Sequence, residues 1–295
     1  MEHAHVRYLE SKRSVDDRAL NRRVRDRLLA ELPADPEIVE FAAGTGVTVP
    51  RLLDWGVTAF DYRGIEQDAD LVRYARDRRA AELAGSVGGV EPTEHGFRTD
   101  DLDAAFHVGD ALTPEAADAD LVIAQAFADL VPHDDLLDAL SRVLGPDGLA
   151  YLPITFDGGT LFQPDHPADD RVEEAYHQNI AAEPGRDPRA GRHLLDRFRA
   201  ADGDLLAAGA SDWIVRPTDG DLLAAGASDW IVRPTDGDYP ADEAFFLSRI
   251  LDFAADALDG AGIEDADDWI QTRRDQLAAG ELTYVAHQYD LLYAP

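Results

Sequence analysis

The feature that most constrains this sequence is a short apolar strand that runs directly into a glycine-containing turn. Residues 37–42 (Glu-Ile-Val-Glu-Phe-Ala) have the composition of a strand, and two glycines then lead into a helical segment near 47–55. A turn that brings the backbone close to a ligand requires residues without bulk that accept positive φ, and Gly44 and Gly46 have both properties. The pattern predicts a strand–turn–helix unit with a ligand site at its turn.

The alternation of strand and helix continues to residue 155. A second strand is expected to end near residue 65, and further strands are expected at 104–108, 120–125 and 149–155. Helices are expected at 68–84 and 133–144, and a loop at 85–100. Residues 120–125 (Asp-Leu-Val-Ile-Ala-Gln) are apolar enough to form a parallel strand that is buried on both faces. Strands separated by crossover helices predict a doubly wound α/β sheet.

Residues 6–31 are expected to form one helix with a capping-box-like start at Ser14 and Asp17. The segment can be a solvated face, paired with neighbouring aspartates, or a lid that helps to hold an anionic group. It holds the densest basic cluster of the chain: Lys12, Arg13, Arg18, Arg22, Arg23, Arg25 and Arg27.

The second half of the chain is less regular. A loop is expected at 156–170, helices at 169–182, 190–201, 241–259 and 264–279, and a long last strand at 282–293. We expect one domain over 1–295, with an N-terminal helical lid (1–33), a ligand-binding half (34–156) and a half with a helical insert that faces the substrate (157–295).

Residues 202–218 recur letter for letter as 219–235. Two copies are too few for a solenoid. Each copy is expected to encode the end of a helix and a short strand, at 212–215 or 229–232. We expect one copy to take a position in the sheet and the other to form a surface excursion, because lengthening a loop costs little free energy.

The composition excludes several classes of protein. The chain has no cysteine, which excludes disulfides and thiolate sites, and no apolar run long enough to span a bilayer. The N-terminus lacks the layout of a secretory signal, so a cytoplasmic location is expected. The net charge of −32, spread over every segment, resembles the proteins of salt-loving archaea and makes nucleic-acid binding improbable. The sequence leaves the oligomeric state open, and no acid or histidine cluster has metal-ligand spacing.

Two acids follow the second and third predicted strands. Glu66 lies 20 residues beyond Gly46, where a carboxylate can accept hydrogen bonds from both hydroxyls of a ribose. Asp110 follows the third strand and can accept a hydrogen bond from an adenine amino group. Parallel strands end at one edge of a sheet. The glycine turn, Glu66 and Asp110 therefore together predict a nucleoside site at the switch point of the sheet. Ordinary tight turns with solvated acids are the alternative.

At this point the sequence resembles the class I S-adenosylmethionine-dependent methyltransferases. Glu40 to Gly46 is similar to that family's first motif, with Ala42 in place of its first glycine. The resemblance implies a Rossmann-like sheet of about seven strands, mostly parallel, with an antiparallel C-terminal strand. It also implies S-adenosylmethionine as cofactor and a small-molecule acceptor. The implied contacts are Glu40, Ala42, Gly44 and Gly46 at the methionine part and its turn, Glu66 at the ribose, Asp110 and Ala111 at the adenine, and Gln125 near the methyl group.

Three side chains are candidates for a catalytic base: Asp129 after the fourth strand, His177 in the insert and His287 on the last strand. Histidine is a common choice because neutral imidazole is available near neutral pH. Either histidine can equally be structural. Two other functions stay open: a non-catalytic nucleoside-binding regulator, and a NAD(P)-dependent oxidoreductase. The oxidoreductase fits less well because its third motif glycine would fall at Val49.

Overall fold

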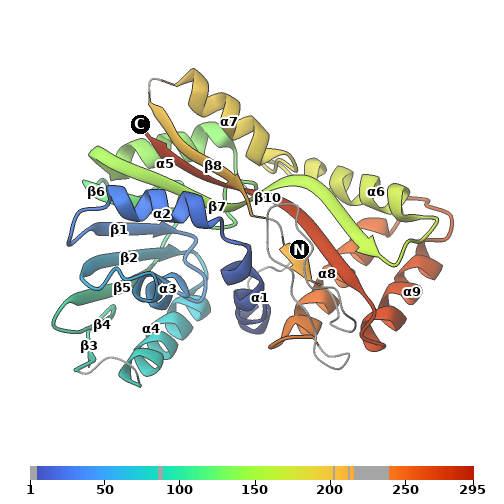
Figure 1. The fold of residues 1–295 in the computed structure, drawn as a ribbon, viewed down its shortest axis with the longest axis horizontal. Helices are drawn as coiled ribbons and strands as arrows, with labels where there is room; N and C mark the ends of the chain where they lie inside the picture. The colour runs from blue at the N-terminus through green and yellow to red at the C-terminus, as the bar shows by residue number, and fades with distance from the viewer. Residues whose placement is uncertain (1–4, 86–88, 202, 212, 216–238) are drawn as a thin grey trace.

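The computed structural model describes residues 5–85, 89–201, 203–211, 213–215 and 239–295 (Figure 1). Within these residues, a ten-stranded sheet has the order β3-β4-β5-β2-β1-β6-β7-β10-β8, with β9 paired to β10. The strands are β1 (Glu37–Phe41), β2 (Phe60–Glu66), β3 (Glu91–Pro92), β4 (Gly96–Arg98), β5 (Leu102–Val108), β6 (Ala119–Ile123), β7 (Leu144–Gln163), β8 (Asp204–Ala210), β9 (Trp213–Val215) and β10 (Thr283–Ala294).

The centre of the sheet is parallel. Strands β5, β2, β1, β6 and β7 pair in parallel, and β10 then lies antiparallel between β7 and β8. The chain first moves outward from β1 through β2 to β5 and then returns to β6 on the other side of β1. The reversal between β1 and β6 is the switch point at which ligands bind in open α/β sheets. The predicted doubly wound sheet with an antiparallel last strand is confirmed.

Helices cover both faces of the parallel strands (Figure 1). The first face packs against α2, α3 and α4 through residues such as Leu28, Leu52 and Val72, and the other against α5 and α7 through Leu136 and Phe198. The described helices are α1 (Val6–Ala19), α2 (Arg22–Glu31), α3 (Thr48–Asp54), α4 (Ala69–Ala84), α5 (His133–Val143), α6 (Asp169–Ala182), α7 (Ala190–Ala200), α8 (Glu243–Leu258) and α9 (Ala266–Ala278).

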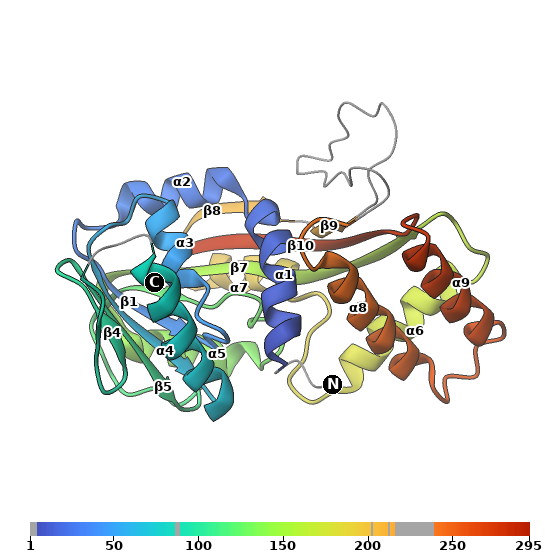
Figure 2. The ribbon, with the colours of Figure 1, turned by 90° about the horizontal axis from the view of Figure 1, so that it is seen from below.

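Beyond the parallel strands, β7 and β10 continue as a long antiparallel ribbon that carries α6, α8 and α9 (Figure 2). A separate apolar cluster fills this half, with Trp269, Tyr284 and Phe246 buried in it. Helix α1 stands between the two halves and contributes Tyr8 and Val15 to the same cluster. The carboxyl ends of the parallel strands therefore face α1.

The N-terminal segment is two helices, so the expected single helix over 6–31 is wrong. The chain breaks at Leu20 and Asn21, and the Asn21 side chain caps α2 by accepting hydrogen bonds from the backbone N–H groups of Arg23 and Val24. The backbone N–H of Asn21 donates to buried Asp290 at 2.8 Å. Ser14 caps no helix and instead donates to Glu243. A tertiary partner therefore sets the break.

Strand β7 is much longer than expected, because 156–163 continue the strand where a loop was predicted. Antiparallel β10 supplies backbone partners for most of the extension, with Phe156 opposite Gln288 and, beyond an irregularity, Thr160 opposite Ala286 to Gln163 opposite Thr283. Residues 145–148, between the predicted helix at 133–144 and the predicted strand at 149–155, lie inside β7 as an irregularity, since Ala119 pairs with Leu144 but Leu121 pairs with Leu149.

Two connections also differ from the prediction. The loop expected at 85–100 contains the short antiparallel pair β3 and β4, which extends the sheet beyond β5. Between β5 and β6 the chain crosses over through turns at 109–118 and forms no helix there. The remaining predicted helices and strands are present within a few residues of the expected bounds.

The first copy of the repeat forms β8 and β9, both paired to β10. One copy therefore occupies a position in the sheet, as expected, although 204–210 is a strand where the end of a helix was expected. The second copy, 219–235, lies outside the described residues. No helix in the described part of the chain is long and apolar enough to cross a membrane.

Candidate functional site

The turn after β1 has the backbone conformation that its sequence predicts. Ala42, Gly44 and Gly46 have φ values of 52°, 54° and 74°, in the left-handed region that favours glycine. A Cβ atom on Gly46 would lie 2.6 Å from the Phe106 ring. Glycine is therefore required at position 46 for both its conformation and the space, and the turn packs closely onto β5.

Glu66 joins the turn to the end of β2. Its Oε2 accepts a hydrogen bond from the Gly44 backbone N–H at 3.0 Å, and its Oε1 accepts one from the Asp68 backbone N–H at 3.0 Å. A carboxylate has about four lone-pair positions, so these two bonds leave further acceptor capacity on both oxygens. Glu66 can thus fix the turn and still bind a pair of ligand hydroxyls.

Glu40 lies beneath the turn. Its Oε1 accepts a hydrogen bond from Thr48 Oγ1 at 2.7 Å and its Oε2 accepts one from the Tyr62 hydroxyl, and only 3% of the residue is exposed. Burial raises the pKa of Glu40 to about 7. The geometry makes Glu40 a support that joins β1, β2 and the start of α3.

Asp110 and Ala111 follow β5 at the same edge of the sheet. The Gly109 backbone N–H donates to the Glu66 backbone oxygen at 3.0 Å, which places this segment beside Glu66. Asp110 is exposed, and its Oδ1 accepts a hydrogen bond from the Leu112 backbone N–H. Ala111 is buried. The second and third predicted contact points therefore lie together, as the nucleoside-site hypothesis requires.

Gln125, after β6, contacts α1 and α3. Its Nε2 donates to Asp16 at 2.9 Å, and its Oε1 accepts a hydrogen bond from Arg51. Arg51 is itself paired with Asp17 at 2.7 Å. In this arrangement Gln125 fixes the N-terminal helix over the ends of β1 and β6.

Helix α1 covers the turn directly. The Leu9 side chain would lie 3.4 Å from a Cβ atom on Gly44. Fully buried Arg79 of α4 binds Glu10 and Glu82 and donates from Nε to the Thr45 backbone oxygen at 2.9 Å. These ion pairs tie α1 to the turn, so α1 has the place of a lid.

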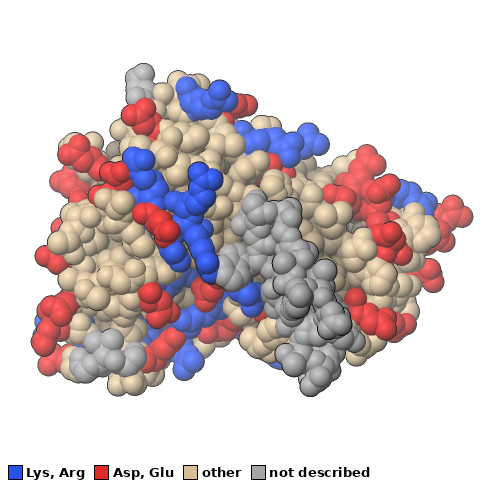
Figure 3. Space-filling view, in the orientation of Figure 1, with Lys and Arg blue, Asp and Glu red and all other residues tan. Residues whose placement is uncertain are grey.

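Most of the basic residues of the N-terminal segment are paired with acids. Lys12 lies 3.6 Å from Asp16 and Arg13 lies 3.8 Å from Asp17. Basic side chains gather in a band over the middle of one face, while acids dominate its edges (Figure 3). The expected pairing with neighbouring aspartates is present.

Asp129, the catalytic candidate that follows β6, is half-buried. Burial raises the pKa of its carboxyl group. Its charge contributes to raised pKa values of the buried Tyr8 and Tyr176 hydroxyls, where burial is the larger cause. Tyr8 lies on α1 and Tyr176 on α6, so the charge of Asp129 acts on one hydroxyl of the lid and one of the insert.

The two candidate histidines lie along the extension of β7. His177 Nε2 is 3.1 Å from Thr160 Oγ1, its ring meets the Phe156 ring edge-on, and burial lowers its pKa. His287 Nε2 is 3.9 Å from Asp157, whose two carboxylate oxygens accept hydrogen bonds from Nε and Nη2 of Arg192. His287 therefore faces an ion pair rather than the turn.

Sequence reasoning missed Arg79, Thr48 and Tyr62, which support the turn from below and beside it. A signal for Arg79 was present, since it takes the place of an apolar residue between Ala75 and Leu83 on the buried face of α4. Within the described part of the chain, no group of three or more histidines and acids has a geometry that could hold a metal ion.

No family model and no curated protein matches the sequence. Among solved structures, a SAM-dependent methyltransferase from Thiobacillus denitrificans in complex with S-adenosyl-L-homocysteine is 16% identical, with 100% of both chains covered and a TM-score of 0.49. A SAM-dependent methyltransferase from Geobacter sulfurreducens, in complex with the same molecule, is 15% identical, with 98% of both chains covered and a TM-score of 0.45.

Geranyl diphosphate C-methyltransferase from Streptomyces coelicolor A3(2) is 13% identical, with 92% of this chain and 78% of the other covered and a TM-score of 0.44. At these scores, the three likenesses carry no argument about this chain. Its fold follows from its own strand order, and its function must be argued from its own residues.

Proposed function

We propose that the chain is an S-adenosylmethionine-dependent methyltransferase that acts on a small-molecule acceptor. The observation that carries the proposal is the contact between Gly44 and Glu66 at the switch point of the sheet. It combines a backbone turn at positive φ with a carboxylate at the next strand end, and such a pair suits a nucleoside with a polar tail.

The residues fit that cofactor one by one. The turn around Ala42 and Gly44 offers close approach to the backbone for the methionine part, and the free acceptor positions of Glu66 suit the two ribose hydroxyls. Exposed Asp110 can accept a hydrogen bond from the adenine amino group, and buried Ala111 can pack against the ring. Glu40 supports the turn from below, and Gln125, which donates to Asp16 of α1, would lie near the methyl group.

S-adenosylmethionine supplies an activated methyl group on a sulfonium. The protein then has to exclude water and align an acceptor atom, which takes the methyl group as its bond to sulfur breaks. Helix α1, held by Arg79 and Gln125, covers the turn and keeps water out. Half-buried Asp129 would take a proton from the acceptor, and its raised pKa would make it a stronger base than an exposed aspartate.

The acceptor would bind between α1, α6, the end of β6 and the middle of β7, where Tyr8, Tyr176 and Phe156 are wholly or partly buried. Aromatic side chains of this kind suit a small molecule. The net charge of −32 disfavours a nucleic-acid acceptor. We further propose that the protein works in concentrated salt, which screens its acidic surface.

The test is a methyl-transfer screen in molar KCl with a donor labelled on its methyl group and pools of small-molecule acceptors. The proposal expects label in a small product, and the Asp129→Asn variant should lose at least about tenfold in turnover while it binds the donor normally. Donor binding without transfer to any pool would favour a regulatory nucleoside-binding protein. Binding of NAD(P) in place of the donor would support an oxidoreductase.

A further inference from the structure

The repeat places one segment in the sheet and gives the chain a second segment with the same sequence. Strand β8 pairs with β10 from Asp204 opposite Ala294 to Ala210 opposite Tyr289, and β9 pairs with 284–286 of the same strand. Between them, the Ser211 backbone N–H donates to the Gln288 backbone oxygen at 2.9 Å.

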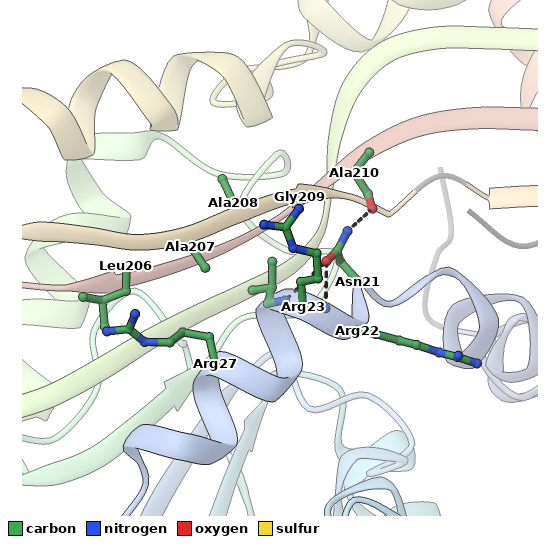
Figure 4. A pocket seen from close by; sticks show the side chains of 10 residues that line it. Asn21, Arg22, Arg23, Arg27, Leu206, Ala207, Ala208, Gly209 and Ala210 are labelled. Carbon is green, nitrogen blue, oxygen red and sulfur yellow. Dashed lines mark hydrogen bonds between the residues drawn. The ribbon is translucent and has the colours of Figure 1, made fainter. Parts of the chain in front are cut away.

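Helix α2 completes the position of β8. The Asn21 side chain donates to the Ala210 backbone oxygen at 2.8 Å and lies directly under Gly209 (Figure 4). Leu206 and Ala207 pack against the cluster that contains Val24 and Leu28. The partners of β8 and β9, namely β10, Asn21 and helices α1, α2 and α7, all lie outside both copies of the repeat.

We propose that either copy of the repeat can fill the β8–β9 position, so that the chain has two folded arrangements with the same sheet. Residues 219–235 have the same side chain as 202–218 at every step. Every contact that the first copy makes with β10 and α2 is therefore open to the second copy, and the two arrangements differ only in their connections.

The connections are long enough for both arrangements. With the second copy in the position, 201–220 would join α7 to the strand and 233–242 would join the strand to α8. Strand β9 and the start of α8 both contact α1, a helix of 14 residues that is about 21 Å long. Residues 233–242 reach about 33 Å when extended. The two arrangements differ in the lengths of these two connections. Because the entropy cost of closing a loop grows slowly with its length, that difference favours the first arrangement over the second only about fourfold.

Glycine substitutions distinguish this proposal from the alternative that only the first copy can occupy the β8–β9 position. A Cβ atom on Gly209 would lie 2.4 Å from Asn21 Nδ2, so Gly209→Val bars the first copy and Gly226→Val bars the second. The proposal expects each single variant to lower the midpoint of thermal unfolding by about 3 °C at most, and the double variant to lower it by roughly 5–10 °C. Ala208→Val, at an exposed position of β8, is the matched control.

A chain without 219–235 supplies the second control, because deletion of either copy gives the same polypeptide. In that chain Gly209→Val should lower the midpoint as much as the double variant does in the full chain. If Gly209→Val alone in the full chain already has the full effect and Gly226→Val has none, the position belongs to the first copy and the proposal is wrong.

Disulfide trapping reads the occupant directly, since the natural chain has no cysteine. Val285 is the backbone partner of Ile214, so the Val285→Cys chain is combined with either Ile214→Cys or Ile231→Cys. The proposal expects an intramolecular disulfide in both chains, located by peptide mapping. A disulfide with position 214 only, or disulfides that only join separate chains, would overturn it.

Discussion

The backbone N–H of Gly44 lies 3.0 Å from Oε2 of Glu66, and this bond links the turn after β1 to the end of β2. The two residues are far apart in the sequence but adjacent at the switch point because β1 and β2 are parallel neighbours in the sheet. The proposed nucleoside site depends on this link.

Replacement of Glu66 by Ala should weaken S-adenosylhomocysteine binding by about 1–3 kcal/mol, because charge-assisted hydrogen bonds to the ribose would be lost. Isothermal calorimetry in molar KCl measures the effect. Glu91→Ala removes an exposed acid paired with Arg98 and should leave the affinity unchanged. Equal affinities for the Glu66→Ala and wild-type proteins would remove Glu66 from the site.

Gly46→Ala should destabilise the fold by roughly 2–4 kcal/mol, because it combines positive φ with a contact of 2.6 Å to the Phe106 ring. Gly56 has φ of 90° with no atom within 4 Å of an added Cβ, so Gly56→Ala isolates the conformational cost. Urea unfolding compares the two variants. Losses of the same size would mean that Phe106 yields and that the turn is not closely packed.

Glu40 should make stability depend on pH. Its folded-state pKa of about 7 lies above the ordinary value of 4.5, so its contribution is fully present below that ordinary value and is lost as the pH rises through about 7. Glu40→Gln removes this pH-dependent contribution to stability. The thermal midpoint of the wild type relative to Glu40→Gln should therefore fall between about pH 5 and about pH 8.

The control for this pH dependence is Glu37→Gln, an exposed acid on the same strand. Its midpoint difference from the wild type should not change between the two pH values. A Glu40→Gln difference that is just as constant would show that Glu40 titrates as an ordinary surface acid.

Arg79→Met should cost roughly 2–4 kcal/mol, since it leaves Glu10, Glu82 and the Thr45 backbone oxygen without their buried partner. It should also loosen α1, which hydrogen exchange of α1 backbone amides would detect. Arg73→Met removes an exposed ion pair on the same helix and should change little. If hydrogen exchange in α1 is the same in the Arg79→Met and wild-type proteins, Arg79 does not hold α1 over the turn.

The parallel half of the fold could be predicted from the sequence because its signals are local. An apolar strand, a glycine turn and a helix follow one another within each unit, and Gly46 needs glycine for reasons visible in a single turn. The places of Glu66 and Asp110 then follow from the topology of a parallel sheet.

The remainder depends on partners that are distant in the sequence. The break at Asn21 is tied to Asp290, and the extension of β7 exists because β10 pairs with it. The contact of Arg79 with Glu10 was equally hidden, because only the packing of α1 on α4 brings them together.

The most direct test of the proposed cofactor site is calorimetric titration of S-adenosylhomocysteine into the folded protein in molar KCl. The account predicts a single site per chain that is occupied at micromolar ligand and is lost in Gly46→Val, whose side chain would displace the Phe106 ring. No binding to the folded wild-type protein, or equal binding to the folded Gly46→Val protein, would contradict it.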